Sequence, residues 1–112
     1  MSWIHLNQPS EFEALASDFS KPIVIFKHST RCGVSSSALK MFQPDAENIA
    51  QSAQLCMVDV IKSRDLSNYL AQKTEIRHES PQVLVINNGK VVYNASHHFI
   101  DSKEVLSLIS NT

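Results

Sequence analysis

Two short apolar runs, at 23–27 and 55–60, constrain the fold of this chain more than any other feature. They read Ile23-Val24-Ile25-Phe26-Lys27 and Leu55-Cys56-Met57-Val58-Asp59-Val60. Because successive side chains of a strand point to opposite faces, an uninterrupted apolar run is typical of a strand covered on both faces. Segments with apolar residues at helical spacing surround both runs. The alternation predicts an α/β domain with buried, parallel strands at its centre.

Four segments show the spacing of amphipathic helices. The first follows a capping box formed by Ser10 and Glu13, and the last follows one formed by Asp101 and Glu104. The second begins around Cys32, and Pro44 is expected to kink or end it. The expected apolar faces are Phe12, Leu15, Ala16 and Phe19; Val34, Ala38, Met41 and Phe42; Leu66, Tyr69 and Leu70; and Val105, Leu108 and Ile109.

A β-hairpin is predicted near the C-terminal end. Asn88-Gly89 separates apolar runs at 83–87 and 90–95, and both residues tolerate the positive φ that a two-residue hairpin turn requires. Residues 3–6 are expected to add a short edge strand. The resulting order βαβαβαββα is that of a thioredoxin fold. We therefore expect residues 1–112 to form a single thioredoxin-like domain, with a central mixed sheet of four to five strands flanked by about four helices.

Composition and charge argue against several classes of function. A net charge of −1 gives no electrostatic reason to expect nucleic acid or a membrane surface as partner. No stretch approaches the roughly 20 apolar residues of a membrane span, and residues 1–11 lack the pattern of a signal peptide. The two cysteines form neither a metal quartet nor a disulfide framework, and no histidine pair shows ligand spacing. We expect a cytoplasmic protein without a metal site.

Cys32 has the surroundings of a reactive thiol. At the start of a helix it faces unpaired backbone N–H groups and the positive end of the helix dipole, which both favour the thiolate. Lys27, His28 and Arg31 precede it closely, and polar residues flank it. Ser35, one turn further, is expected to donate a hydrogen bond to the thiolate, but it cannot attack a mixed disulfide. The alternative is a cysteine that merely packs, which these polar flanks disfavour.

A second part of the site is predicted at Ser80-Pro81, directly before the strand at 83–87. In a thioredoxin fold this proline is cis and turns the backbone of Ser80 towards the nucleophile. The second strand of the hairpin returns to the same edge of the sheet, so His97 and His98 are expected near Cys32. A histidine there could protonate a leaving thiol, although a solvated polar loop is the alternative.

Cys56 lies in the middle of a buried strand and is expected to be an unreactive core residue. The alternative is a distant resolving cysteine, which would require an exposed strand end.

Three separated motifs closely resemble the YtxJ-type bacilliredoxins, the monothiol proteins of the bacillithiol system. They are Lys27-His28-Ser29-Thr30-Arg31-Cys32-Gly33-Val34-Ser35-Ser36, His78-Glu79-Ser80-Pro81-Gln82 and Ala95-Ser96-His97. The resemblance implies a thiol-disulfide oxidoreductase that removes bacillithiol from protein mixed disulfides, with bacillithiol as co-substrate and no other cofactor. The implied partners are S-thiolated client proteins, a low-molecular-weight thiol and a disulfide reductase. Cys32 is the expected nucleophile, and substrate contacts are expected from Arg31, Gly33, Val34, Ser35, Ser80, Pro81 and His97.

Gly33 departs from that pattern, since such proteins often carry proline after the cysteine. Two alternatives remain open, and a dithiol thioredoxin is disfavoured. A dithiol thioredoxin would need a cysteine at position 35 and a buried Asp at position 26, where this chain has Ser35 and Phe26. Cys32-Gly33-Val34-Ser35 differs by one residue from the Cys-Gly-Phe-Ser motif of monothiol glutaredoxins that carry a [2Fe–2S] cluster, but the loops those proteins use are missing. A non-catalytic thioredoxin-like interaction module would leave Cys32 unreactive towards iodoacetamide at neutral pH.

Overall fold

The structure, a computed structural model that describes residues 3–110, is built around strand β2. This strand pairs in parallel with β3 and antiparallel with β4. The full sheet has five strands in the order β1-β3-β2-β4-β5, which confirms the predicted mixed sheet. The elements are β1 (Ile4–His5), α1 (Pro9–Ala16), β2 (Ile23–His28), α2 (Gly33–Phe42), η1 (Gln43–Asp45), α3 (Ala46–Ser52), β3 (Gln54–Asp59), α4 (Arg64–Thr74), β4 (Gln82–Asn87), β5 (Lys90–Ser96), η2 (His97–Phe99) and α5 (Ser102–Ser110).

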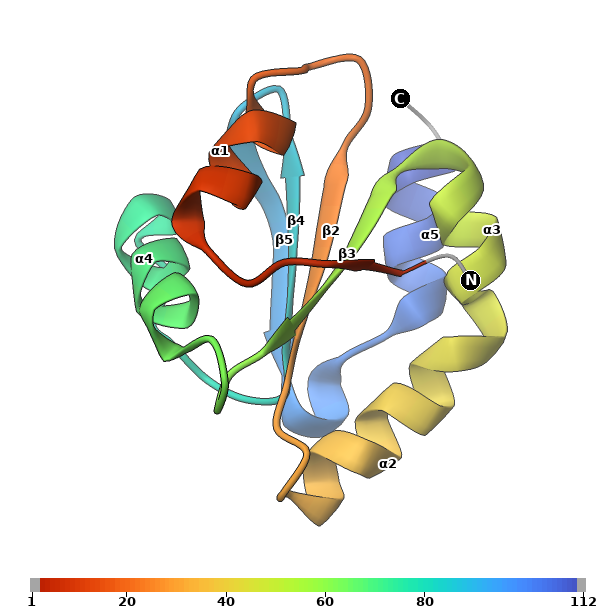
Figure 1. Ribbon diagram of the computed structural model, residues 1–112. Helices are drawn as coiled ribbons and strands as arrows, with labels where there is room; N and C mark the ends of the chain where they lie inside the picture. Colours follow the sequence, from red (N-terminus) through yellow and green to blue (C-terminus); the bar gives the residue numbers. More distant parts are fainter. Residues whose placement is uncertain (1–2, 111–112) are drawn as a thin grey trace.

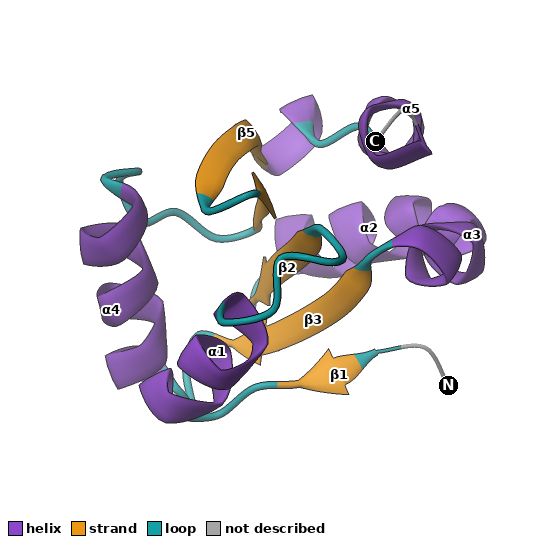
Figure 2. Cartoon of the chain, turned by 90° about the horizontal axis from the view of Figure 1, so that it is seen from above, coloured by secondary structure: helices purple, strands orange, loops and turns teal. Residues whose placement is uncertain are grey.

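Helices cover both faces of the sheet. Helices α1 and α4 lie on one face and α2, α3 and α5 on the other (Figure 1), and the view from above separates the two layers (Figure 2). Along β2 the buried side chains alternate accordingly. Val24 and Phe26 belong to the core under α2, α3 and α5, whereas Ile23 and Ile25 belong to the core under α1 and α4. This two-sided burial explains the uninterrupted apolar runs of the sequence.

The predicted hairpin is confirmed. Strands β4 and β5 pair antiparallel, with Asn87 opposite Lys90. The two turn residues, Asn88 and Gly89, have φ of 54° and 78°, the left-handed conformation that a type I′ turn requires at both positions. The turn returns β5 to the edge of the sheet where β2 and β3 end, and this brings η2 towards the start of α2 (Figure 1).

The N-cap of the first helix lies two residues before the predicted cap, Ser10. Gln8 is its N-cap and Pro9 its first residue, so the acidic partner of the cap is Glu11, whose carboxylate accepts the backbone N–H of Gln8 at 2.9 Å. The predicted box of Ser10 and Glu13 was therefore wrong. Proline outranks serine here because its fixed φ suits the first helical position. Phe19, expected on the apolar face, lies beyond the helix and is 62% exposed.

Helix α2 begins at the predicted point, but its expected apolar stripe is only partly buried. Phe42 packs in the core, whereas Val34 and Met41 are 50% and 79% exposed. Pro44 interrupts the helix as predicted, since the short 3₁₀ helix η1 separates α2 from α3. The final helix is capped by Asp101, whose carboxylate accepts the backbone N–H of Lys103 at 3.0 Å. Among residues 3–110, no helix is both long and apolar enough to cross a bilayer.

Cys56 is a core residue, as predicted. Its side chain has no exposed surface and packs in the core under α1 and α4. Burial raises the pKa of this thiol to about 12. Cys32, at the start of α2, is partly exposed. The two thiols therefore lie in different environments, Cys56 in the core under α1 and α4 and Cys32 at the start of α2, a helix of the opposite face.

The two cysteines should differ sharply in reactivity. We expect iodoacetamide to alkylate Cys32 alone in the folded protein at neutral pH, because the thiolate is the nucleophile and Cys56 is both buried and protonated. Intact-protein mass spectrometry should show one adduct in buffer and two in denaturant. Alkylation of Cys56 at a comparable rate in the native state would contradict its placement, and an unreactive Cys32 would favour the interaction-module alternative.

Candidate active site

Cys32 lies in a tight turn that joins β2 to α2. Its backbone N–H donates to the carbonyl of Ser29 at 3.2 Å, and its own carbonyl accepts the N–H of Ser36 at 3.0 Å, the first hydrogen bond of the helix. Cys32 is thus the N-cap of α2, and its side chain makes no capping hydrogen bond. The sulfur is free to react at the end of the helix where backbone N–H groups lack helical partners. Arg31 and Gly33 on either side are exposed.

Ser35 faces the interior of the protein. It is completely buried, its Oγ accepts the backbone N–H of Ser29 at 3.0 Å, and this Oγ lies 2.7 Å from Nδ1 of His28. The expected hydrogen bond from Ser35 to the sulfur of Cys32 is not among the hydrogen bonds of the described residues. The hydroxyl instead fastens the first turn of α2 to the end of β2, and so it holds the turn that carries Cys32.

His28 completes this contact. Burial lowers the pKa of His28, and the carboxylate of Asp59 opposes that effect. A neutral imidazole protonated at Nε2 accepts a hydrogen bond at Nδ1. In that tautomer the Ser35 hydroxyl accepts from Ser29 and donates its single proton to His28, so this proton is not available to Cys32.

The Ser80–Pro81 peptide bond is cis, as expected for this fold. The carbonyl of Pro81 accepts the backbone N–H of His97 at 3.0 Å, which ties the loop before β4 to η2. His97 itself has φ of 56°, a left-handed conformation that histidine adopts more readily than most residues. The predicted convergence of Pro81 and His97 at one edge of the sheet is confirmed.

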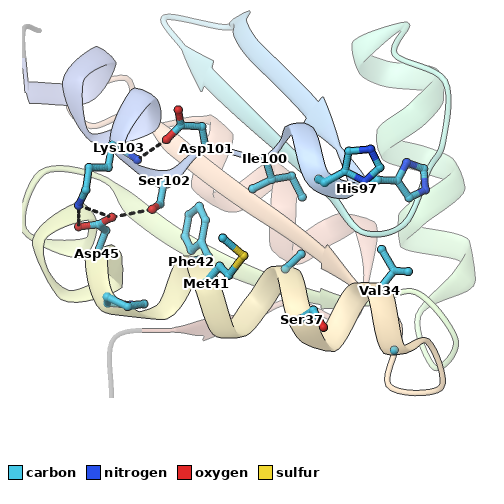
Figure 3. Close-up of a pocket in the computed structure, with 14 residues that line it drawn as sticks. Val34, Ser37, Met41, Phe42, Asp45, His97, Ile100, Asp101, Ser102 and Lys103 are labelled. Atoms are coloured by element: carbon cyan, nitrogen blue, oxygen red, sulfur yellow. Dashed lines mark hydrogen bonds and ion pairs between the residues drawn. The ribbon is translucent and has the colours of Figure 1, made fainter.

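A groove of about 760 Å³ runs from the first turn of α2 to the start of α5. Val34, Met41 and Phe42 line it from α2, and His97 and Ile100 line it from the opposite side (Figure 3). At one end His97 faces Val34, next to Cys32. Val34 and Met41, the residues of the predicted apolar face of α2 that the core does not bury, therefore line this groove.

At its other end a buried carboxylate links the two sides of the groove. Asp45 accepts a hydrogen bond from the Ser102 hydroxyl at 2.6 Å and pairs with the ammonium of Lys103 at 3.2 Å (Figure 3). The hydrogen bond from Ser102 and then the Lys103 charge lower the pKa of Asp45. The Asp45 clamp, as we call these three residues, joins η1 to α5.

Sequence reasoning missed a buried polar cluster beneath the Ser80–Pro81 loop. Lys27 is completely buried, its Nζ donates to Oε1 of Gln82 at 3.3 Å, and Nε2 of Gln82 donates to the carbonyl of Arg77 at 2.9 Å. Burial lowers the pKa of Lys27 to about 8. Burial and then the Lys27 charge lower the pKa of His78. Nδ1 of His78 and Oγ of Ser80 are buried without a hydrogen-bond partner among the described residues.

This cluster changes the interpretation of Lys27. From the sequence, we expected Lys27 to lie with Arg31 among the basic residues around the Cys32 thiol. Because side chains alternate along β2, Lys27 shares the α1/α4 face with Ile25, and α2 lies on the other face. Its amine therefore supports the loop that contains Pro81. The alternation of side chains along β2 could have predicted this burial, because it places Lys27 on the same face as Ile25. A polar side chain at such a position requires a polar partner.

The structure brings together most of the predicted site residues. Gly33, Val34 and His97 line the end of the groove beside Cys32, and Pro81 is hydrogen-bonded to His97. Arg31 is exposed beside the cysteine, whereas the side chains of Ser35 and Ser80 turn inward.

Comparison with known proteins assigns both family and fold. The family model described as "Monothiol bacilliredoxin BrxC" matches residues 4–105. A solved structure of a proposed oxidoreductase with a thioredoxin fold is 30% identical in sequence, with a TM-score of 0.79 over 97% of this chain and 94% of that chain.

Thioredoxins share the fold at lower identity. The thioredoxin of Schistosoma mansoni is 24% identical, with a TM-score of 0.72 over 97% of this chain and 94% of its own. Mitochondrial thioredoxin 3 of Saccharomyces cerevisiae is 17% identical, with a TM-score of 0.72 over 99% of this chain and 96% of its own. The predicted thioredoxin-like fold is therefore confirmed.

Replacing Lys27 with methionine should stabilise the protein at neutral pH. The pKa of this amine falls from about 10.4 in the unfolded chain to about 8 in the folded protein, so below pH 8 the folded state carries the full cost of a buried charge. Allowing for the lost Gln82 contact, we expect Lys27→Met to raise the free energy of unfolding by about 1–2 kcal/mol at pH 7.

The pH dependence gives this prediction its sign. Between about pH 8 and pH 10 the unfolded state binds more protons than the folded state, so wild-type stability rises and the gain from Lys27→Met shrinks. Urea unfolding at several pH values measures the wild-type stability and the gain from Lys27→Met. Lys62→Met, at an exposed position, is the control. A variant less stable than wild type at pH 7 would show that Lys27 contributes more than its buried charge costs.

Removing the Ser35 hydroxyl should destabilise the protein. Ser35→Ala leaves the Ser29 N–H and Nδ1 of His28 without their partner, and we expect it to lower the free energy of unfolding by about 1–2 kcal/mol. The same substitution at the exposed neighbour Ser36 should change stability by less than about 0.5 kcal/mol. Equal effects at the two positions in urea unfolding would mean that the Ser35 contacts do not hold the turn.

Proposed function

The chain belongs to the monothiol bacilliredoxin BrxC family, and we propose that it removes bacillithiol from protein mixed disulfides through Cys32. Membership of this family and the thioredoxin fold make it a thiol redox enzyme. The small thiol and the direction of transfer are the proposal. Its support is the partly exposed thiol of Cys32 at the N-terminus of α2, the other cysteine being buried, with Ser35 at the position where a dithiol enzyme carries its second cysteine.

The proposed reaction is a thiolate–disulfide exchange. The Cys32 thiolate attacks the bacillithiol sulfur of a client mixed disulfide. The Cys32–bacillithiol bond forms while the client–bacillithiol bond breaks, and the client cysteine leaves as a thiolate that takes up a proton. No electrons enter or leave the system in this step.

The burial of Ser35 and Cys56 supports a monothiol cycle. The Ser35 hydroxyl is committed to Ser29 and His28, and Cys56 lies in the opposite core, so neither competes for the bacillithiol on Cys32. A second bacillithiol thiolate then attacks the bacillithiol sulfur of the Cys32–bacillithiol disulfide, and Cys32 leaves as the thiolate. The product is bacillithiol disulfide, which a separate disulfide reductase reduces. We place this cycle in the cytoplasm, where thiols are kept reduced.

The residues around Cys32 receive roles in this proposal. Arg31, exposed beside the sulfur, attracts the carboxylates of the small thiol. The main chain of Ser80 and Pro81 pairs with the extended substrate, and Gly33 and Val34 shape the approach to Cys32. His97, which lines the groove with Gly33 and Val34 beside Cys32, supplies the proton to the departing client thiolate.

A product trapped on Cys32 would test this proposal. After reaction with a bacillithiolated protein, without free small thiol, intact-protein mass spectrometry should show one bacillithiol adduct, located on Cys32 by peptide mapping. Cys32→Ser should abolish turnover because it removes the nucleophile. Cys56→Ser, the same change at the buried cysteine, should retain most of it.

Two results would contradict the monothiol cycle. One is a loss of two hydrogens with a Cys32–Cys56 disulfide, which would make Cys56 the resolving residue. The other is efficient removal of glutathione but not of bacillithiol, which would assign a different small thiol to the same cysteine.

A further inference from the structure

The groove along α2 exposes an unusual amount of apolar surface beside the reactive cysteine. Val34 and Met41, which line it, are 50% and 79% exposed. Phe99, between two lining residues, is 74% exposed. Large apolar side chains exposed in and beside one groove are typical of a site that another molecule covers.

The charges of the groove disfavour the small thiol as its occupant. Among the described residues that line it, Lys103 is the one lysine or arginine, and its ammonium is paired with Asp45 in the clamp. A thiol that carries carboxylates therefore finds no free ammonium or guanidinium there, whereas Arg31, next to Cys32, is exposed and is not among the lining residues. The clamp also pairs Asp45, and the second carboxylate of the lining, Asp101, accepts the backbone N–H of Lys103 at the start of α5.

The groove and the reactive sulfur form one continuous surface. The groove begins at Gly33 and Val34, the two residues after Cys32, and follows α2 to Met41. At about 1.5 Å per residue, nine helical residues separate Cys32 from Met41 by roughly 13 Å. An extended polypeptide covers that length with about four residues.

We propose that this groove binds an apolar segment of the client polypeptide, about four residues long and next to its S-thiolated cysteine. The proposal rests on the proposed function. The client is thereby held on the α2–η2 side of Cys32, and the small thiol lies on the Arg31 side. This division selects the reaction described above: the bacillithiol sulfur is attacked, and the client sulfur leaves.

Two synthetic peptides test the proposal. Each carries one cysteine in mixed disulfide with bacillithiol, flanked by leucine and valine in one peptide and by serine and asparagine in the other. Wild-type protein should prefer the apolar peptide on the order of tenfold in kcat/KM, the gain expected from burying about one large apolar side chain. A bacillithiol–mercaptoethanol disulfide serves as a substrate without any polypeptide.

Met41→Glu is the diagnostic variant, because Met41 is well exposed and far from the sulfur. It should remove the preference for the apolar peptide, and its effect on that peptide should exceed its effect on the small disulfide at least fivefold. Val92→Glu is the matched control: Val92 is 47% exposed on β5, outside the groove, and the preference should survive there.

Each contrary result has a distinct meaning. Equal turnover of both peptides by wild type, or a preference that survives Met41→Glu, would overturn the groove proposal. So would a wild-type dimer in light scattering that Met41→Glu dissociates, since a second copy would then occupy the groove. If no bacillithiol disulfide reacts, the proposed function fails. The same peptides as mercaptoethanol disulfides then still test the groove through their rates of adduct formation on Cys32.

Discussion

The pairing of β2 on both of its edges is the constraint on which the rest of the structure depends. Because this strand pairs with β3 and β4 and is covered on both faces, its position in the sheet is fixed. Its last residue, His28, therefore has a fixed place, and so has the turn that follows. The contact of His28 with Ser35 then sets where α2 begins. Strand β4, paired on the other edge, starts directly after Pro81 and brings the second part of the site alongside.

Features with a local cause could be predicted from the sequence. The turn at Asn88-Gly89 needs only two residues that tolerate positive φ, and Cys56 needs only its apolar neighbours to be recognised as buried. The positions of Cys32, Pro81 and His97 at one edge followed from strand directions alone. The misplaced cap of α1 was also a local matter, where Pro9 and Ser10 competed for the start of one helix.

Features that depend on distant partners could not be predicted. Nothing near Ser35 in the sequence indicates that His28 will take its hydroxyl, because a strand end and a helix must first be brought together. The alternation along β2 could mark Lys27 as buried, but nothing in the sequence identifies Gln82, on the neighbouring strand, as its partner. The helical spacing of α2 predicted that Val34 and Met41 lie on one apolar face. It could not show that η2 and α5 leave a groove along that face.

The Asp45 clamp bears on the thermodynamics of recognition. It connects η1, which continues α2, to the first turn of α5, and so both walls of the groove are held by a hydrogen-bonded, charge-assisted contact. Walls held in this way have little conformational freedom to lose when the groove is filled. The ordering entropy of an association at this surface therefore falls mainly on the incoming molecule, and a segment that is already extended and rigid binds with the least penalty.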